Sequence, residues 1–368
     1  MASDARIAGK VALSVYQLSE IISLRDCMLL IVENATPLIK PATKPTMNPK
    51  IHDNLEQTVI LEHLRAACHS PAHLQSEGYF LGVLSAEKIE RSANNSIPYE
   101  DFLPVPHSKP STEKRLAIVI DCEMVEAADE RRMLAYLSAI DFFTGEVLVN
   151  NYVKPTERIH NWKTQFSGVT PALMSCACAA GQAIRGWQSA HQRLWDFLNE
   201  DTILVGHFLN SDFDVLGMFH LNIVDSAIMT SEAVLLPHSP TERLRHMWGL
   251  KTLAKDFLKR DIQNGKSGHS ALEDAFATRD VVLWCLSNSQ QLQVWAKQTR
   301  IRTQKRGSAK RGVSSMNSKG KHKSRGGSSP RTDFDDEYYQ DLESLNWSDI
   351  AEDSGWPHSD TGYDPWSD

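Results

Sequence analysis

Five apolar residues in a row, LAIVI at 116–120, are followed at once by two acidic residues, Asp121 and Glu123. A short continuous apolar run is typical of a strand that a sheet buries on both faces. Side chains two residues apart on an extended backbone project from the same face, so the two carboxylates are expected to converge at the end of this strand. A solvated strand end remains the alternative interpretation of so short a motif.

Strand and helix patterns alternate around this run. Residues 134–142 and 146–153 flank Thr144-Gly145, and together they predict a β-hairpin. The later elements predicted from the pattern are a helix starting at Thr170-Pro171, a helix at 187–198, a strand at 202–206, and helices at 209–219, 250–258 and 270–286. A hairpin followed by alternating strands and helices predicts one α/β domain with a mixed sheet at 114–290.

The segment before this domain, residues 1–113, is predicted to be an extension with a small helical element. Apolar residues recur at helical spacing over 51–67, and 94–112 is rich in Pro, Ser and Asn, as in a linker. Cys68 and His69 stand together at the end of the predicted helix. One such pair is more often structural than metal-binding, so no chemistry is assigned to it.

The composition changes abruptly at the C-terminal end. Residues 297–331 contain 12 Lys and Arg and no acidic residue, whereas 333–368 contain 12 Asp and Glu and no Lys or Arg. Segments with so little apolar content and so much like charge do not bury a core. We therefore predict a disordered basic linker at 291–331 and a disordered acidic tail at 332–368.

Membrane and secreted classes are not expected. The apolar run at 28–32 is far too short to span a bilayer, and the first residues do not have the pattern of a signal peptide. The six cysteines form no C-x-x-C pair, which favours reduced thiols in an intracellular protein.

A second acidic motif, GHFLNSDFDVL at 206–216, carries Asp212 and Asp214 in a mostly apolar run. On a helix, Asp212 shares a stripe with Leu209 and Leu216, whereas Asp214 lies about 200° around the axis and should face water. A carboxylate on a core-facing stripe is costly unless it is protonated, paired or bound to a metal. A hydrogen-bonded structural aspartate therefore stays open as the alternative.

A third motif is GHSALEDAFATRD at 268–280. Ser270 is a suitable cap for the predicted helix, which leaves His269 just outside the positive helix end and Asp274 within the helix, with Glu273 beside it. Taken alone, such residues usually serve the helix dipole or the surface.

Together the three motifs supply four carboxylates and one imidazole. This set is well matched to phosphoryl hydrolysis with two divalent cations about 3.5–4 Å apart and a histidine that deprotonates the attacking water. Ligation by oxygen alone favours Mg²⁺ or Mn²⁺ over Zn²⁺.

In this order and spacing, the motifs resemble those of the DEDDh exonucleases of the ribonuclease H-like superfamily. The resemblance covers about residues 115–288 and is closest to the RNA exonuclease 4-like group, particularly its fungal members. The H-x4-D spacing of His269 and Asp274 is that of the DEDDh branch. A register using Phe276 and Asp280 is rejected, because phenylalanine lacks the hydroxyl that the tyrosine-bearing sister branch needs.

The resemblance implies a ribonuclease H-like mixed sheet flanked by helices, with two Mg²⁺ ions, or Mn²⁺, at its active site. By resemblance, the metal ligands would be Asp121, Glu123, Asp212 and Asp274, and the general base would be His269. The stretch 161–171 is also familiar in this group, so the residues implied near the terminal nucleotide are Met124, Phe166, Ser167 and Gly168. Asp214 departs from the pattern of this family, because a lysine is common at its position. The departure concerns how the substrate is contacted and not the metal ligands.

The implied activity is metal-dependent 3′-5′ hydrolysis of single-stranded RNA to nucleoside 5′-monophosphates, in RNA processing, such as rRNA processing, or turnover. The alternatives are a DNA-directed exonuclease and a non-catalytic nucleic-acid-binding scaffold. The basic segment 297–331 is expected to add non-specific affinity for nucleic acid and to favour a nuclear or nucleolar location, otherwise a cytoplasmic one. Alternatively, the acidic tail folds onto the basic segment and competes with RNA.

Overall fold

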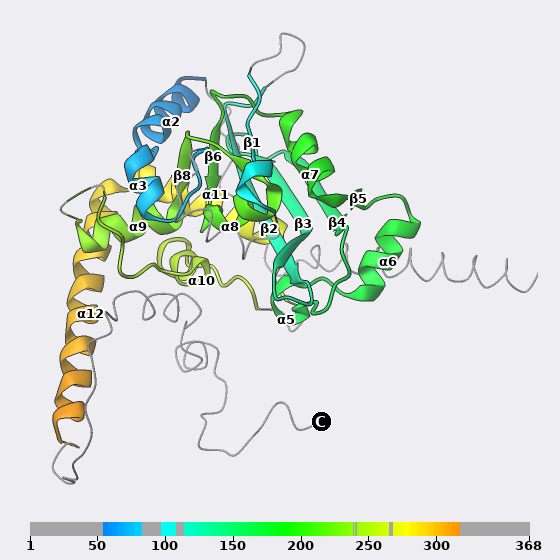
Figure 1. Ribbon diagram of the computed structural model, residues 1–368. Coiled ribbons are helices and arrows are strands. Elements are labelled where there is room, and N and C mark those ends of the chain that lie inside the picture. The colour runs from blue at the N-terminus through cyan, green and yellow to red at the C-terminus, as the bar shows by residue number, and fades with distance from the viewer. Residues whose placement is uncertain are drawn as a thin grey trace, which may run out of the picture. The chain divides into compact units, whose positions relative to one another are not determined.

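A six-stranded mixed sheet with helices on both faces forms the centre of the protein (Figure 1). The computed structural model describes residues 54–82, 97–107, 114–237, 239, 241–264 and 268–316, with side chains at 55–303. Residues up to Gly307 form one unit, and the second unit, Ser308–Asp368, is described only by the helical residues up to Met316. The predicted acidic tail lies outside the described residues.

The sheet has the strand order β5-β4-β3-β2-β6-β8. In chain order its strands are β2 (Ala117–Glu126), β3 (Arg132–Asp141), β4 (Val147–Lys154), β5 (Ile184–Arg185), β6 (Ile203–Gly206) and β8 (Ile223–Asp225). The first three strands form an antiparallel meander, β6 and β8 continue it in parallel on the other side of β2, and β5 runs parallel to β4. The predicted hairpin and the mixed α/β sheet are therefore confirmed.

Strand β2 is longer than the sequence pattern predicted. It continues past the apolar run to Glu126, because its pairing with β3 persists through a register shift after Glu123. The prediction that the two carboxylates follow the end of the strand is therefore wrong, since Asp121 and Glu123 lie inside it. The partner on the other side, β6, pairs with β2 only as far as Val119. Among the described residues, one edge of β2 thus has no strand partner where the carboxylates lie.

The two faces of β2 pack against different helices. Ile118 and Ile120 belong to the core under α7 (Gly186–Trp195) and α8 (Leu209–Leu216). Val119 belongs to the core under α11 (Ala271–Ser287), which α2 (Asn54–Ala66) extends. Because side chains alternate along a strand, the odd-numbered residues Asp121 and Glu123 project toward the α11 side.

Helix α8 ends earlier than predicted. It stops at Leu216 because Gly217 adopts a left-handed conformation, with φ +60°, and a Cβ atom there would lie 2.6 Å from Cζ3 of Trp187. The next residues form β7 (Met218–Phe219), which pairs with β1 (Leu103–Pro104). The helix predicted over 209–219 is therefore three residues too long.

The other predicted helices are present. Helix α6 (Pro171–Ala179) begins after Thr170, whose hydroxyl accepts a hydrogen bond from the Leu173 amide at 3.2 Å, as expected for a cap. The predicted helix at 250–258 consists of α10 (Leu250–Leu253) and a π-helical turn, η3 (Ala254–Leu258). None of the described helices has the length and apolar content that crossing a membrane requires.

The described part of the N-terminal extension packs into the same cores as the sheet. It comprises α2, α3 (Pro71–Ser76), the short helix η2 (Tyr99–Asp101) and β1. Leu64 lies in the core under α11, and Leu74 and Tyr79 lie in the core under α8. The extension and the predicted α/β domain are thus packed together.

The prediction that a disordered basic linker begins at residue 291 is wrong for its first part, which is helical. Helix α12 runs from Ser289 to Met316, although its composition is polar and basic. Its first turns are held by tertiary contacts: Ala296 is buried, the Trp295 indole donates to Asp256 Oδ2 at 2.8 Å, and Arg300 Nε donates to the Val234 carbonyl at 2.6 Å. These contacts offset the weak helical amphipathicity of the segment.

The expectation that all six cysteines are reduced thiols is only partly met. Among the residues that the structure describes, Cys68, Cys122, Cys178 and Cys285 are free. Cys176 is disulfide-bonded, so the expectation is wrong for that residue.

Candidate active site

Three of the predicted carboxylates meet on the α11 side of β2. Asp121 and Glu123 project from β2 toward α11, and Asp274 lies in the first turn of α11. One oxygen from each of these residues lies within 4.8 Å of the other two. Ser270 caps α11 as predicted, since its hydroxyl accepts from the Glu273 amide at 3.4 Å. The first and third sequence motifs are therefore brought together.

Asp212 lies beside this cluster but is not part of it. As predicted from helical phase, it is buried on α8. Its carboxylate accepts hydrogen bonds from the thiol and the backbone amide of Cys122, which projects from the opposite face of β2 to Asp121. The charge of Asp212 nevertheless contributes to the raised pKa values of Asp121 and Glu123, so it adjoins them.

Asp214 is less exposed than its helical phase predicted. It is half-buried, and burial raises its pKa to about 7, an effect that the nearby Arg132 guanidinium opposes. The prediction that Asp214 faces open water is therefore wrong. The reason is that α8 packs closely against β2 and β3, so even the side of α8 turned away from Asp212 is partly covered.

Burial disfavours the charge on all four carboxylates. Burial, reinforced by the neighbouring carboxylates, raises the pKa of Glu123 to about 9 and that of Asp121 well above its usual value. Burial likewise raises the pKa of Asp212 to about 8 and that of Asp274 to about 7. Glu123 Oε1 and Asp274 Oδ1 are buried and have no hydrogen-bond partner among the described residues. Unpartnered, crowded carboxylate oxygens are a donor set that fits divalent cations such as Mg²⁺.

Removing one of these charges is expected to stabilise the metal-free protein. The folded-state pKa values lie above the unfolded values of about 4, so the contribution of these carboxylates to stability is fully present below pH 4 and is lost as pH rises toward 9. In EDTA at pH 9, Asp121→Asn should therefore unfold with a free energy larger by about 1–2 kcal/mol than the native chain. Thermal melting at pH 5 and pH 9 measures this difference. The exposed Asp201→Asn is the matched control, and a lower melting temperature for Asp121→Asn at pH 9 would contradict the expectation.

His269 stands directly before α11, at the rim of the cluster. Its Nδ1 is 3.8 Å from Asp274 Oδ2, and its side chain is 38% exposed. Burial lowers its pKa, and the charge of Lys251 lowers it further. The imidazole is therefore mostly neutral at neutral pH and able to accept a proton, as a general base must.

A short helix, α5 (Thr164–Ser167), lies against the backbone beside His269. The His269 amide donates to the Phe166 carbonyl at 2.7 Å. Gly268 has φ +87°, and a Cβ atom there would lie 2.3 Å from both the Gly168 nitrogen and the Thr164 oxygen. Only glycine fits this close backbone approach, which places the expected nucleotide-binding residues of α5 next to the expected base.

The expected nucleotide-binding residues differ in what their side chains can do. Phe166 is 39% exposed and Met124 is partly buried against the α8 core. Gly168 ends α5 in a left-handed conformation. Ser167 is buried, with its hydroxyl donating to the Trp162 carbonyl at 2.9 Å and accepting from the Val169 amide at 3.1 Å. The Ser167 side chain therefore shapes the loop.

Gly268→Ala is expected to destabilise the protein by about 1–3 kcal/mol, because the left-handed backbone and the contact with α5 both disfavour a methyl group. Urea denaturation measures the change. Gly249→Ala is the matched control, since Gly249 has φ −66° and no neighbouring side chain or backbone atom lies within 4 Å of the point that a methyl group would occupy. It should lose less than about 1 kcal/mol, and an equal loss in both variants would contradict the account of this contact.

Two further residues position the site and have no counterpart in the sequence motifs. Gln263 Nε2 donates to Asp274 Oδ2 at 2.8 Å from a backbone with φ +56°. Asp225, at the end of β8, accepts from the amides of Phe208 and Leu209 at 3.1 and 3.0 Å, and so fixes the start of α8. An aspartate before a helix is a recognisable capping signal for its own helix. The contact between Gln263 and Asp274 could not be predicted, because no motif spacing connects these two residues.

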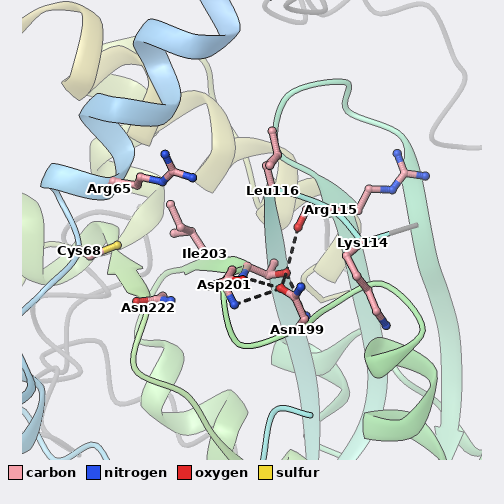
Figure 2. Close-up of a pocket in the computed structure, with 10 residues that line it drawn as sticks. Arg65, Cys68, Lys114, Arg115, Leu116, Asn199, Asp201, Ile203 and Asn222 are labelled. Carbon is pink, nitrogen blue, oxygen red and sulfur yellow. Dashed lines mark hydrogen bonds between the residues drawn. The ribbon is translucent and has the colours of Figure 1, made fainter. Parts of the chain in front are cut away.

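The pocket in Figure 2 lies elsewhere in the fold. Leu116 and Ile203 line it where β2 and β6 begin, whereas the carboxylates lie farther along β2. Its basic side chains are already engaged: Arg65 with a glutamate at 3.1 Å, Arg115 with a glutamate at 2.9 Å, and Lys114 with a carbonyl at 2.8 Å. We assign this pocket no role.

Comparison with known proteins identifies the domain that carries the cluster. The RNase_T family, described as an exonuclease family, matches residues 118–282, which contain all five residues of the predicted catalytic set. This domain is a ribonuclease H-like exonuclease of the DEDD type. The predicted family and fold class are thereby confirmed.

Curated relatives of the exonuclease domain carry RNA exonuclease names. RNA exonuclease 3 of Candida albicans is 30% identical over 193 residues, which are 50% of this chain and 42% of that protein. RNA exonuclease 4 of Candida glabrata is 36% identical over 165 residues, which are 44% of this chain and 56% of that protein. The chain thus spans about half of the length of these two relatives. Among solved structures, the pseudoubiquitin-hydrolase-RNase module of Saccharomyces cerevisiae PAN2 is 20% identical, with a TM-score of 0.43, and covers 55% of this chain and 32% of that chain.

Proposed function

We propose that this protein is a divalent-metal-dependent 3′-5′ exonuclease that releases nucleoside 5′-monophosphates from single-stranded RNA. The observation that carries the proposal is the cluster of Asp121, Glu123 and Asp274, with Asp212 and His269 beside it, inside a domain of the exonuclease family. The RNA exonuclease names of its relatives support RNA as the substrate.

The four carboxylates would hold two Mg²⁺ ions, or Mn²⁺, between β2, α8 and α11. When bound, the ions relieve the mutual repulsion of the carboxylates and stabilise the charge that develops on the attacking and leaving oxygens. Gln263 holds one oxygen of Asp274 by a hydrogen bond, which leaves the unpartnered Oδ1 of the same residue to act as a ligand. Asp225 fixes the start of α8 and thereby positions Asp212.

His269 is proposed to take the proton from the attacking water. As that water forms a bond to the terminal phosphorus, the bond from phosphorus to the preceding 3′ oxygen breaks, and this oxygen takes a proton from solvent, so that the shortened chain ends in a 3′ hydroxyl. The imidazole is suited to this step because it is partly exposed and its lowered pKa keeps it neutral before the reaction. Phe166, exposed on the neighbouring α5, is proposed to pack against the terminal nucleotide, since bases stack on aromatic side chains.

The basic segment 297–331 is proposed to add non-specific affinity for RNA and to direct the protein to the nucleus, where rRNA processing is one role open to it. Within this segment Arg300 is an exception, because its guanidinium donates to the carbonyls of Val234 and Ala233. The remaining basic residues should give binding that weakens as salt concentration rises.

Parallel digestion of matched RNA and DNA strands tests this proposal. With Mg²⁺, the chain is expected to release nucleoside 5′-monophosphates from single-stranded RNA that has a free 3′ hydroxyl, and to stop at a blocked 3′ end. Faster digestion of DNA would replace RNA with DNA as the substrate. Release of internal fragments, or binding without any product under Mg²⁺ or Mn²⁺, would contradict the proposal.

A further inference from the structure

A second group of metal-ligating side chains lies between α3 and α9 (Ser226–Leu235), two helices that lie side by side in Figure 1. It consists of His69 and His73, which flank the start of α3, and Glu232 on α9. One ligand atom from each lies within 4.8 Å of the other two. We propose that these three residues bind a Zn²⁺ ion that fastens the N-terminal extension to the exonuclease domain.

Both imidazoles present the same nitrogen to the same carboxylate. His73 Nδ1 is 2.7 Å from Glu232 Oε1, and His69 Nδ1 is 3.7 Å from Glu232 Oε2. The two histidines are buried, whereas the Glu232 side chain is 37% exposed. The three ligand atoms therefore converge at a point that is enclosed by protein on the histidine side and accessible to solvent on the glutamate side.

The outer nitrogens of the two rings lie near a carbonyl and a carboxylate, the kinds of group to which zinc-binding histidines donate. His69 Nε2 lies 3.2 Å from the Asp225 carbonyl and accepts from the Asp225 amide at 3.1 Å. With zinc on Nδ1, Nε2 would carry the proton and donate to the carbonyl instead. His73 Nε2 has no hydrogen bond among the described residues and lies 3.6 Å from Glu77 Oε1. A metal-bound histidine commonly donates its other N–H to a carbonyl or a carboxylate, which orients the ring. Glu77 is itself held, since its Oε1 accepts from the Leu244 amide at 2.7 Å.

The donor set selects zinc over magnesium. Two imidazole nitrogens and one carboxylate oxygen form a ligand set that suits four-coordinate Zn²⁺, whereas Mg²⁺ prefers oxygen ligands. The fourth position would be taken by water on the exposed side of Glu232. This site is thus chemically distinct from the carboxylate cluster on β2.

The competing interpretation is a metal-free ion pair. In that arrangement a protonated His73 lies between the carboxylates of Glu77 and Glu232, and His69 accepts from the Asp225 amide. In the zinc site the metal would replace the direct contact between His73 Nδ1 and Glu232, and His69 Nε2 would donate to the Asp225 carbonyl. Retention of a metal distinguishes the two arrangements.

Zinc content of the full chain tests the proposal. After dialysis against metal-free buffer and loading with Zn²⁺ alone, the native chain is expected to retain one zinc per chain in this site. His69→Gln and His73→Gln should lower its zinc affinity at least about 100-fold. Glu77→Gln keeps an acceptor for the Leu244 amide but loses the charge, and should lower the affinity by about 10–100-fold. His63→Gln, at an exposed position on α2, is the matched control and should change nothing.

Two further variants control for misfolding of a histidine variant and for zinc bound at the other cluster. Glu232→Gln changes a partly exposed side chain and gives the same comparison if a histidine variant does not fold. Asp121→Asn should retain the zinc, because its change lies in the other cluster. A native chain that retains no zinc, or a His73→Gln chain that retains as much as the native one, overturns the proposal. Loss of the zinc in Asp121→Asn also overturns it, by assigning the ion to the carboxylates on β2.

Discussion

Asp212→Asn is expected to lower the rate of RNA shortening at least about 10³-fold, whereas Asp214→Asn should leave it within a few-fold. Asp212 is buried beside Asp121 and Glu123, where we propose that its charge helps to hold a cation. Asp214, two residues along the same helix, is turned away from the cluster. Burial raises its pKa to about 7, so an asparagine resembles the neutral form that it already adopts in part.

Single-turnover digestion of 5′-labelled RNA with Mg²⁺ measures both variants against the native chain. Circular dichroism and melting temperature serve as the folding control, because both aspartates lie on the same short helix. An equal loss of activity in both variants would contradict the assignment of Asp212 as the ligand.

His269→Ala is expected to lower the rate by about 10²–10⁴-fold, the usual contribution of a general base. The native rate should rise as pH passes upward through the pKa of His269, which burial places below its usual range, because only the neutral imidazole accepts a proton. The alanine variant should lose this rise, since the group that titrates has been removed.

A pH–rate profile from pH 5 to pH 8 on both proteins separates a base from a merely structural residue. His63→Ala, at an exposed position on α2, is the control and should keep the native profile. A His269→Ala chain that keeps the same pH profile at a reduced rate would assign His269 a positioning role instead.

Local periodicity predicted the parts of the site that depend on a single element. The two-residue spacing of Asp121 and Glu123 placed them on one face of a strand, and helical phase placed Asp212 toward the core. The extension of β2 past Ile120 could not be predicted in the same way, because it depends on pairing with β3.

Contacts between distant segments account for what the sequence did not predict. The cover over Asp214 comes from the packing of α8 against β2 and β3, and the first turns of α12 depend on the buried Ala296 and the Arg300 contacts with α9. The Cys68-His69 pair by itself favours a structural interpretation of His69, because one such pair at a helix end is more often structural than metal-binding. Its partner Glu232 is far away in the chain and meets it only in the folded protein.

We propose that the buried carboxylates of this exonuclease domain hold divalent cations with which the protein hydrolyses RNA from its 3′ end. One time course tests it most directly: 5′-labelled single-stranded RNA incubated with Mg²⁺ and either the native chain or Asp121→Asn. We expect a ladder that shortens from the 3′ end one nucleotide at a time with the native chain, and intact RNA with Asp121→Asn. Intact RNA with the native chain under both Mg²⁺ and Mn²⁺, or an equal ladder with Asp121→Asn, would contradict it.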